Sequence, residues 1–150
     1  MTRKLHRLSL TLPLLVIIFS GILTACSAGT SIKGQDLAMA PMEGMPQEVR
    51  SAPIAVQQAY EFAAANPEMM KNIPCYCGCG AIGHTSNYSC YVSSVESDGK
   101  VIFDTHALGC SICVDITQDA MRLLGQGKAV PEIKAYIDQH YSQYGPSNMP

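Results

Sequence analysis

The chain has 150 residues, with 10 Lys and Arg, 12 Asp and Glu and a formal net charge of −2. This length allows a single domain, and the acidic excess disfavours the nucleic-acid-binding class, whose members usually present a basic face. Seven cysteines stand beside three phenylalanines and no tryptophan, so we expect a small core that depends on its cysteines for part of its stability.

The first 25 residues have the pattern of a secretory signal peptide. Arg3, Lys4 and Arg7 form a basic start, and the apolar run Leu8–Leu23 follows. A short apolar run with small residues after it is typical of a cleaved signal. It is also short for a membrane-spanning helix, which needs about 20 residues. We therefore predict that the chain is exported from the cytoplasm.

The signal ends in Leu23-Thr24-Ala25-Cys26, which resembles the lipobox of bacterial lipoproteins. The resemblance implies cleavage before Cys26 and attachment of lipid to its thiol, and two or more acyl chains anchor a protein stably. An ordinary signal with a chance cysteine is the alternative. Cleavage would leave seven Lys and Arg against twelve Asp and Glu. The predicted location is the outer face of the cell membrane, with membrane lipid as a partner and no nucleic acid.

Residues 26–50 are predicted to be the lipid anchor and a flexible tether, and residues 51–150 the folded domain. The tether contains Ser, Gly, Pro and Gln without a sustained apolar period. Met39, Met42 and Met45 repeat every three residues within it. Thioethers are soft ligands, so this repeat either collects copper or is a chance feature of the tether.

Three segments are predicted to be helices. The first covers residues 52–65, where apolar residues recur at helical spacing, and the sequence also allows a further turn through Met70. The second covers 111–125 and stops at the glycines that follow. The third covers 131–144, opening on a proline and a glutamate and ending at a Gly-Pro pair.

A β-hairpin is predicted between the first two helices. Its strands lie near Tyr88–Val95 and Val101–Thr105, and Asp98-Gly99 forms the turn, because both residues tolerate positive φ. Residues 74–90 are predicted to be an irregular loop crowded with Cys and Gly, and residues 146–150 a loose tail. The predicted fold is therefore a small α+β domain, mainly helical, with about three helices, one β-hairpin and a Cys-rich loop.

Six cysteines remain after Cys26, arranged as C-x-C-x-C, a single residue and C-x-x-C: Cys75, Cys77, Cys79, Cys90, Cys110 and Cys113. An even number of exported cysteines is typical of disulfides. The C-x-C-x-C group is too tight to bridge within itself, so three disulfides would have to crowd at one point. Metal binding accounts for the spacing more directly, because C-x-C and C-x-x-C place two sulfurs on one ion.

Local residues favour the metal interpretation. Gly78 and Gly80 let the backbone turn between ligands. Cys110 and Cys113 are predicted to lie at the start of a helix, where the free amide groups and the helix dipole stabilise the thiolate form that binds metal.

Two histidines extend the candidate ligand set. His84 lies in the Cys-rich loop and His106 lies four residues before Cys110, whereas His140 is far from any cysteine. Six sulfurs and two imidazoles are enough for two tetrahedral ions, and six thiolates alone would suit a cluster of Cu(I). Asp104 is a candidate acceptor for a histidine ring proton.

The sequence resembles a bacterial family named for a P-C-Y-C-G-C motif. The motif stands at Pro74-Cys75-Tyr76-Cys77-Gly78-Cys79. The resemblance continues through Gly83-His84, Cys90, Asp98-Gly99, Asp104, His106 and Cys110 to Cys113, and it covers roughly residues 52–150. It implies a shared fold, a lipid anchor and a cysteine-centred site, and it supplies no activity.

The predicted function is that of an extracytoplasmic, lipid-anchored metal-binding protein that buffers or delivers a soft ion, Cu(I) or Zn(II), with a metal-trafficking protein as a candidate partner. One alternative is a thiol–disulfide oxidoreductase using Cys110 and Cys113, although no strand–helix–strand pattern surrounds this pair. Another is a structural module stapled by disulfides. The sequence offers no convincing nucleophile–base pair, which favours a binding protein over an enzyme.

Overall fold

A computed structural model describes residues 36–150, which belong to one compact unit. The described residues contain five α-helices, α2 (Gln47–Arg50), α3 (Ile54–Ala65), α4 (Pro67–Met70), α5 (Ser111–Gly125) and α6 (Val130–Tyr141), and two strands, β1 (Val92–Val95) and β2 (Val101–Phe103). The domain is small, α+β and mainly helical, as the sequence predicts.

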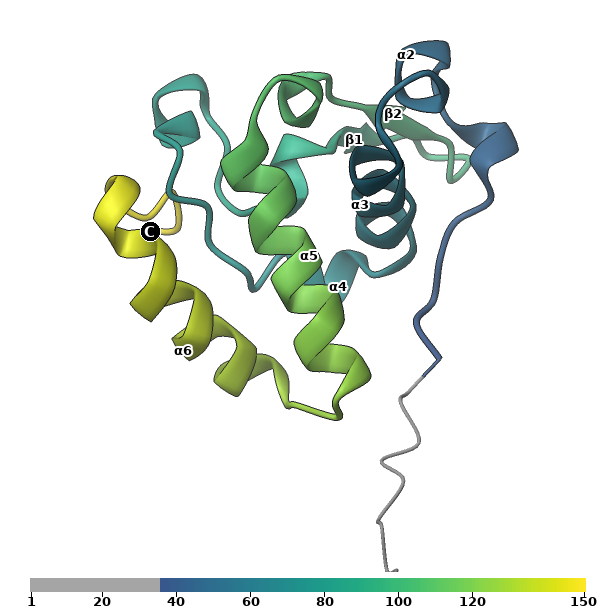
Figure 1. Ribbon diagram of the computed structural model, residues 1–150. Coiled ribbons are helices and arrows are strands. Elements are labelled where there is room, and N and C mark those ends of the chain that lie inside the picture. Colours follow the sequence, from purple (N-terminus) through teal and green to yellow (C-terminus); the bar gives the residue numbers. More distant parts are fainter. Residues whose placement is uncertain (1–35) are drawn as a thin grey trace, which may run out of the picture. The chain divides into compact units, whose positions relative to one another are not determined.

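Helix α5 runs through the middle of the domain, with α3 and α6 packed on either side of it (Figure 1). Ile116 on α5, Phe62 on α3 and Ile133 on α6 are all fully buried in one apolar core. Burying side chains of this size supplies most of the free energy that favours folding, at about 25 cal/mol for each Å² of apolar surface. The helical scaffold is thus held by ordinary apolar packing.

Local signals set the helix boundaries. Pro53 precedes α3, and Pro67 occupies the first turn of α4, where a missing amide hydrogen leaves no bond unmade. The Glu132 carboxylate accepts a hydrogen bond from the Ala129 backbone amide at 3.0 Å and so caps the start of α6. The three predicted helices, which are α3, α5 and α6, therefore lie close to their predicted positions.

The hairpin is present but shorter than predicted. Strands β1 and β2 pair antiparallel, with Val92 opposite Phe103, and Gly99 takes a φ of 88° in the turn. Residues Tyr88–Cys90 form a 3-10 turn in place of the predicted strand start. Cys90 and Tyr91 are consecutive and both fully buried, whereas a strand would point them to opposite faces.

Packed residues are also found on the N-terminal side of residue 51, where the sequence predicts the tether. Met45 and Val49 lie in the core with exposed fractions of 3% and 1%, and α2 begins at Gln47. Met42 packs partly buried against the same core, while Met39 is exposed. The three methionines do not form a free, flexible copper-collecting segment, because Met45 is buried in the apolar core and Met42 packs against it.

The prediction of a loose C-terminal tail is wrong. The Asn148 backbone amide donates to the Cys75 carbonyl at 3.0 Å, and the Cys75 amide donates to Asn148 Oδ1 at 2.7 Å. The last residues, yellow in Figure 1, consequently lie beside the Cys-rich loop, drawn in teal. The Tyr76 hydroxyl ties the same loop to α6 by donating to Asp138 at 2.6 Å.

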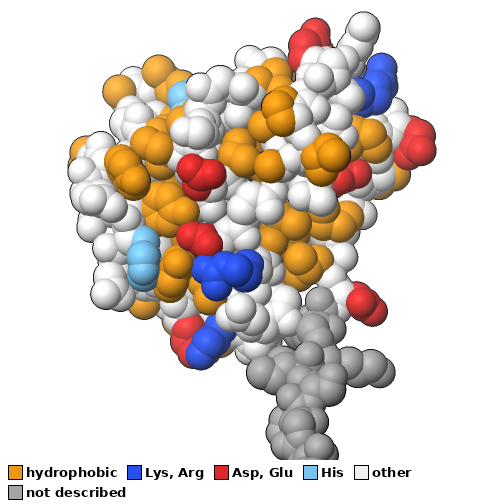
Figure 2. Space-filling model, viewed as in Figure 1, with side chains coloured by type: hydrophobic (Ala, Val, Ile, Leu, Met, Phe, Trp, Pro, Cys, Tyr) orange, Lys and Arg blue, Asp and Glu red, His pale blue; other side chains and the backbone are white. Residues whose placement is uncertain are grey.

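Figure 2 shows the face that carries α5 and α6, where apolar side chains are spread among acidic and basic ones. Within residues 36–150, no helix has the length and apolar character that crossing a membrane requires. The predicted signal peptide and Cys26 lie outside the described residues.

Candidate metal centre

The C-x-C-x-C segment of the Cys-rich loop brings three sulfurs to one place. The loop backbone takes a positive φ of 83° at Gly78 and 91° at Gly83, a conformation that glycine adopts without steric cost. These turns fold C-x-C-x-C so tightly that the Sγ atoms of Cys75, Cys77 and Cys79 all lie within 4.8 Å of one another.

The first turn of α5 supplies two more sulfurs. Cys110 is the N-cap residue and Cys113 lies one turn later, on the face directed at the loop. The Cys113 carbonyl accepts hydrogen bonds from the Tyr91 hydroxyl at 2.8 Å and from Thr117 Oγ1 at 3.1 Å, and Asn87 Nδ2 lies 3.4 Å away. These buried polar contacts fix the helix start against the loop.

The sulfur separations suit a shared ion. Cys75 Sγ lies 3.3 Å from Cys113 Sγ and 3.4 Å from Cys77 Sγ, and Cys77 and Cys113 are 3.6 Å apart. Cys79 and Cys90 form a second close pair at 3.8 Å. Two sulfurs on one tetrahedral zinc ion, with Zn–S bonds of about 2.3 Å, lie about 3.8 Å apart. The described thiols therefore stand close to the spacing that coordination requires.

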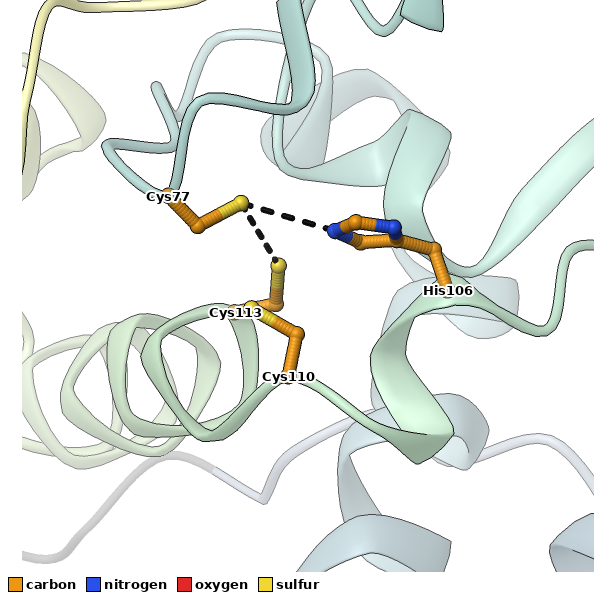
Figure 3. A group of neighbouring side chains, drawn as sticks. All are labelled: Cys77, His106, Cys110 and Cys113. Atoms are coloured by element: carbon orange, nitrogen blue, oxygen red, sulfur yellow. Dashed lines mark hydrogen bonds between the residues drawn. The ribbon is translucent and has the colours of Figure 1, made fainter.

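His106 completes one group of four donors. Its Nε2 atom lies 3.5 Å from Cys77 Sγ, and Figure 3 shows the imidazole and the sulfurs of Cys77 and Cys113 turned toward one another. The ligand atoms of Cys77, His106, Cys110 and Cys113 are all within 4.8 Å of one another. Cys77, Cys110 and His106 are partly exposed, so solvent reaches this side of the centre.

A second group lies deeper and includes His84. The ligand atoms of Cys79, His84, Cys90 and His106 also lie within 4.8 Å of one another. His84 Nδ1 is buried, and nothing in the described part of the chain hydrogen-bonds to it. A buried ring nitrogen without a partner costs free energy unless something binds it, and a metal ion is a suitable partner.

Asp104 holds both histidines in place. Its Oδ2 atom lies 3.6 Å from His84 Nε2, and its Oδ1 atom accepts the His106 backbone amide at 2.7 Å. A carboxylate beside one ring nitrogen orients the other toward a metal. The structure thus places Asp104 beside the candidate ligand His84, a role that sequence analysis leaves open.

Without a cation the thiols cannot all ionise together. The hydrogen bond between the Sγ atoms of Cys75 and Cys113 lowers the pKa of Cys75 and raises the pKa of Cys113. Burial raises the pKa of Cys77 and of Cys79. Each thiolate disfavours the ionised form of its neighbours, and a bound cation removes this penalty.

The six described cysteines are all free thiols. The closest sulfur pairs among them, at 3.3 to 3.8 Å, are far longer than a disulfide bond of about 2.05 Å. The two-stranded antiparallel sheet of the described chain also differs from the strand–helix–strand unit around a thioredoxin-type C-x-x-C pair. The geometry favours metal coordination over both alternatives.

The structure brings together all eight predicted donors, in overlapping groups, from the loop, the hairpin end and α5. His140 lies on α6, where its ring stacks on Tyr136 at 3.8 Å. Asn148 is not among the residues predicted from the sequence, yet its Nδ2 lies 3.4 Å from Cys79 Sγ. No local pattern identifies this residue, because its partners lie about 70 positions away in the chain.

Comparisons with known proteins support the assignment of the motif. The chain matches the model of one protein family over residues 15–150, and that family is described as "Protein of unknown function with PCYCGC motif". Neither the curated proteins nor the solved structures include a match to the chain.

Proposed function

Because the chain belongs to the PCYCGC-motif family, whose function is unknown, we propose a function from the chemistry of its site: a lipoprotein that binds a soft metal ion through clustered thiolates and buffers or delivers it. The observation that carries this proposal is the convergence of six free thiols and two imidazoles into groups within 4.8 Å. Such a donor set suits Zn(II) or Cu(I).

Exposure supports a role in exchange as well as storage. Cys77, Cys110 and His106 are partly exposed, whereas Cys75 and Cys113 are fully buried. A thiolate of a partner protein could therefore approach the ion from the side of Cys110 and replace one ligand at a time. A fully buried centre would suit a structural ion better.

The proposed location is the outer face of the cell membrane, with lipid on Cys26. The supporting observation is the sequence Leu23-Thr24-Ala25-Cys26, which lies outside the described residues. Expression of the full chain with a radiolabelled fatty acid tests this location. Label on the wild type and none on Cys26→Ala is the expected result, and label on both proteins would contradict it.

The metal proposal is tested by purifying the protein anaerobically and measuring metal content and free thiols. At least one equivalent of Zn or Cu is expected, and the double variant Cys77→Ser/Cys113→Ser should bind about one equivalent less than the wild type, because it removes two closely spaced sulfurs. His140→Ala is the matched control and should keep the wild-type content. Less than one equivalent of any transition metal, together with no free thiols, would instead support the disulfide-stapled module.

A further inference from the structure

One sulfur occupies a special position among the donors. Cys75 Sγ lies 3.3 Å from Cys113 and 3.4 Å from Cys77, which belong to the partly exposed group. It also lies within 4.8 Å of Cys79 and of Cys90, which belong to the deep group. Cys75 is itself fully buried, so its neighbours are protein donors on both sides.

The donors are too many for one ion. A zinc or copper ion takes up to four ligands in a sulfur–nitrogen site, and eight donors stand together here. With a single ion, at least four would remain unused, among them buried thiols and the partnerless His84 Nδ1. Unused buried polar groups are costly, so a second ion accounts for the deep group.

The two groups become equivalent in composition when Cys75 is shared. His106 lies within 4.8 Å of the donors of both groups, and its Nε2 contact of 3.5 Å with Cys77 Sγ assigns it to the outer side. The outer side then has two sulfurs and one nitrogen, from Cys77, Cys113 and His106. The inner side has the same set, from Cys79, Cys90 and His84. The shared sulfur gives each ion its fourth ligand. Cys110 remains as an additional thiol on the exposed side, within 4.8 Å of the outer donors.

We propose that the centre holds two ions joined by the Cys75 thiolate: an inner ion on Cys79, Cys90 and His84, and an outer ion on Cys77, Cys113 and His106. Cys110 is the thiol through which the outer ion arrives and leaves. The inner ion is enclosed and stays with the protein, whereas the outer ion is the one that is exchanged. This inference rests on the proposed function and specifies its stoichiometry and its exchangeable site.

Cadmium NMR tests the shared sulfur directly. The anaerobic, metal-free protein is loaded with ¹¹³Cd(II), a soft ion with the same preference for thiolates. Two ¹¹³Cd signals of equal intensity are expected, and they should show scalar coupling to each other through the common sulfur. A single bound equivalent would overturn the proposal, and so would two signals without mutual coupling.

Variants separate the two sites. His84→Ala should shift or remove the inner signal only. Cys110→Ser should keep both signals and their coupling but slow the release of the outer ion to a chelator by about tenfold or more. His140→Ala, a histidine remote from the centre, should reproduce the wild-type spectrum. Loss of both signals in Cys110→Ser would contradict the assignment of this thiol to exchange.

The possible failures are distinguishable from one another. A protein that binds no ¹¹³Cd at all would remove the proposed metal function, and the dinuclear inference with it. One ion bound tightly would leave the metal function in place and remove only the dinuclear inference. Because the coupling is measured on the wild type, the test does not depend on whether Cys75→Ser folds.

Discussion

The helical scaffold and the Cys-rich loop are buried to a similar degree by different means. Ile116 on α5 and Ile133 on α6 have no exposed surface, and neither have Cys75 and Cys90 in the loop. The scaffold uses regular helices and apolar side chains. The loop at residues 74–90 has an irregular backbone, and its thiols and imidazole are groups that bind ions. The comparison teaches that the helical scaffold folds by apolar packing, while the Cys-rich loop is built around groups that bind ions.

The largest stability effect is expected in the scaffold. Ile116→Ala removes a fully buried side chain and should lower the free energy of unfolding by about 3 kcal/mol, through lost burial and the cavity that remains. Urea denaturation of the metal-free and the metal-loaded protein measures the loss. The loss should be the same in the metal-free and the metal-loaded protein, because Ile116 belongs to the apolar core of the helical scaffold.

The exposed Ile54, with 71% of its surface accessible, provides the matched control, since Ile54→Ala makes the same chemical change without a cavity. If the loss of unfolding free energy in Ile116→Ala depended strongly on metal, the helical scaffold would not be independent of the Cys-rich loop.

A smaller effect is expected where the tail meets the loop. Asn148→Ala removes the Oδ1 acceptor of the Cys75 amide and the Nδ2 group beside Cys79 Sγ. We expect a loss of about 1–2 kcal/mol in the free energy of unfolding, because a partly buried amide loses its partner. Faster release of metal to a chelator should accompany it.

Gln143→Ala, an exposed residue whose amide only reaches the His140 carbonyl, is the control for a change in the same segment. Unchanged metal release in Asn148→Ala would show that the tail contributes to stability without holding the centre.

The smallest effect is expected at His140. Its ring stacks on Tyr136, and its Nδ1 lies 2.8 Å from the Tyr136 carbonyl on the exposed side of α6. His140→Ala should change the free energy of unfolding by no more than about 0.5 kcal/mol and leave the metal content unchanged. Thermal unfolding and elemental analysis measure both, and a clear loss of metal would place this histidine in the centre.

The helices and the hairpin turn could be predicted from the sequence because their signals are local. Apolar periodicity and flanking prolines and glycines identify α3, α5 and α6, and Asp98-Gly99 identifies the turn. The candidate ligands could be chosen for a similar reason, since the spacing of C-x-C-x-C and C-x-x-C lies within short segments.

Features that depend on contacts between distant parts of the chain could not be predicted from the sequence. Met45 and Val49 sit in a polar, proline-containing stretch that resembles a linker, and only the three-dimensional core shows that they are buried. Asn148 likewise acts through Cys75, which is distant in the chain. The division of the donors between an exposed and a deep side also depends on burial, which residue spacing does not specify.

The hydrogen bonds on the Cys113 carbonyl have a consequence for selectivity. The start of α5 is held in place by Tyr91, Thr117 and Asn87. The distance between the Cys113 sulfur and the sulfurs of the loop is therefore set largely before any ion arrives. Little conformational entropy is then lost on binding. A much larger ion such as lead would have to displace the helix, and this rigidity should therefore discriminate among soft ions by their radius.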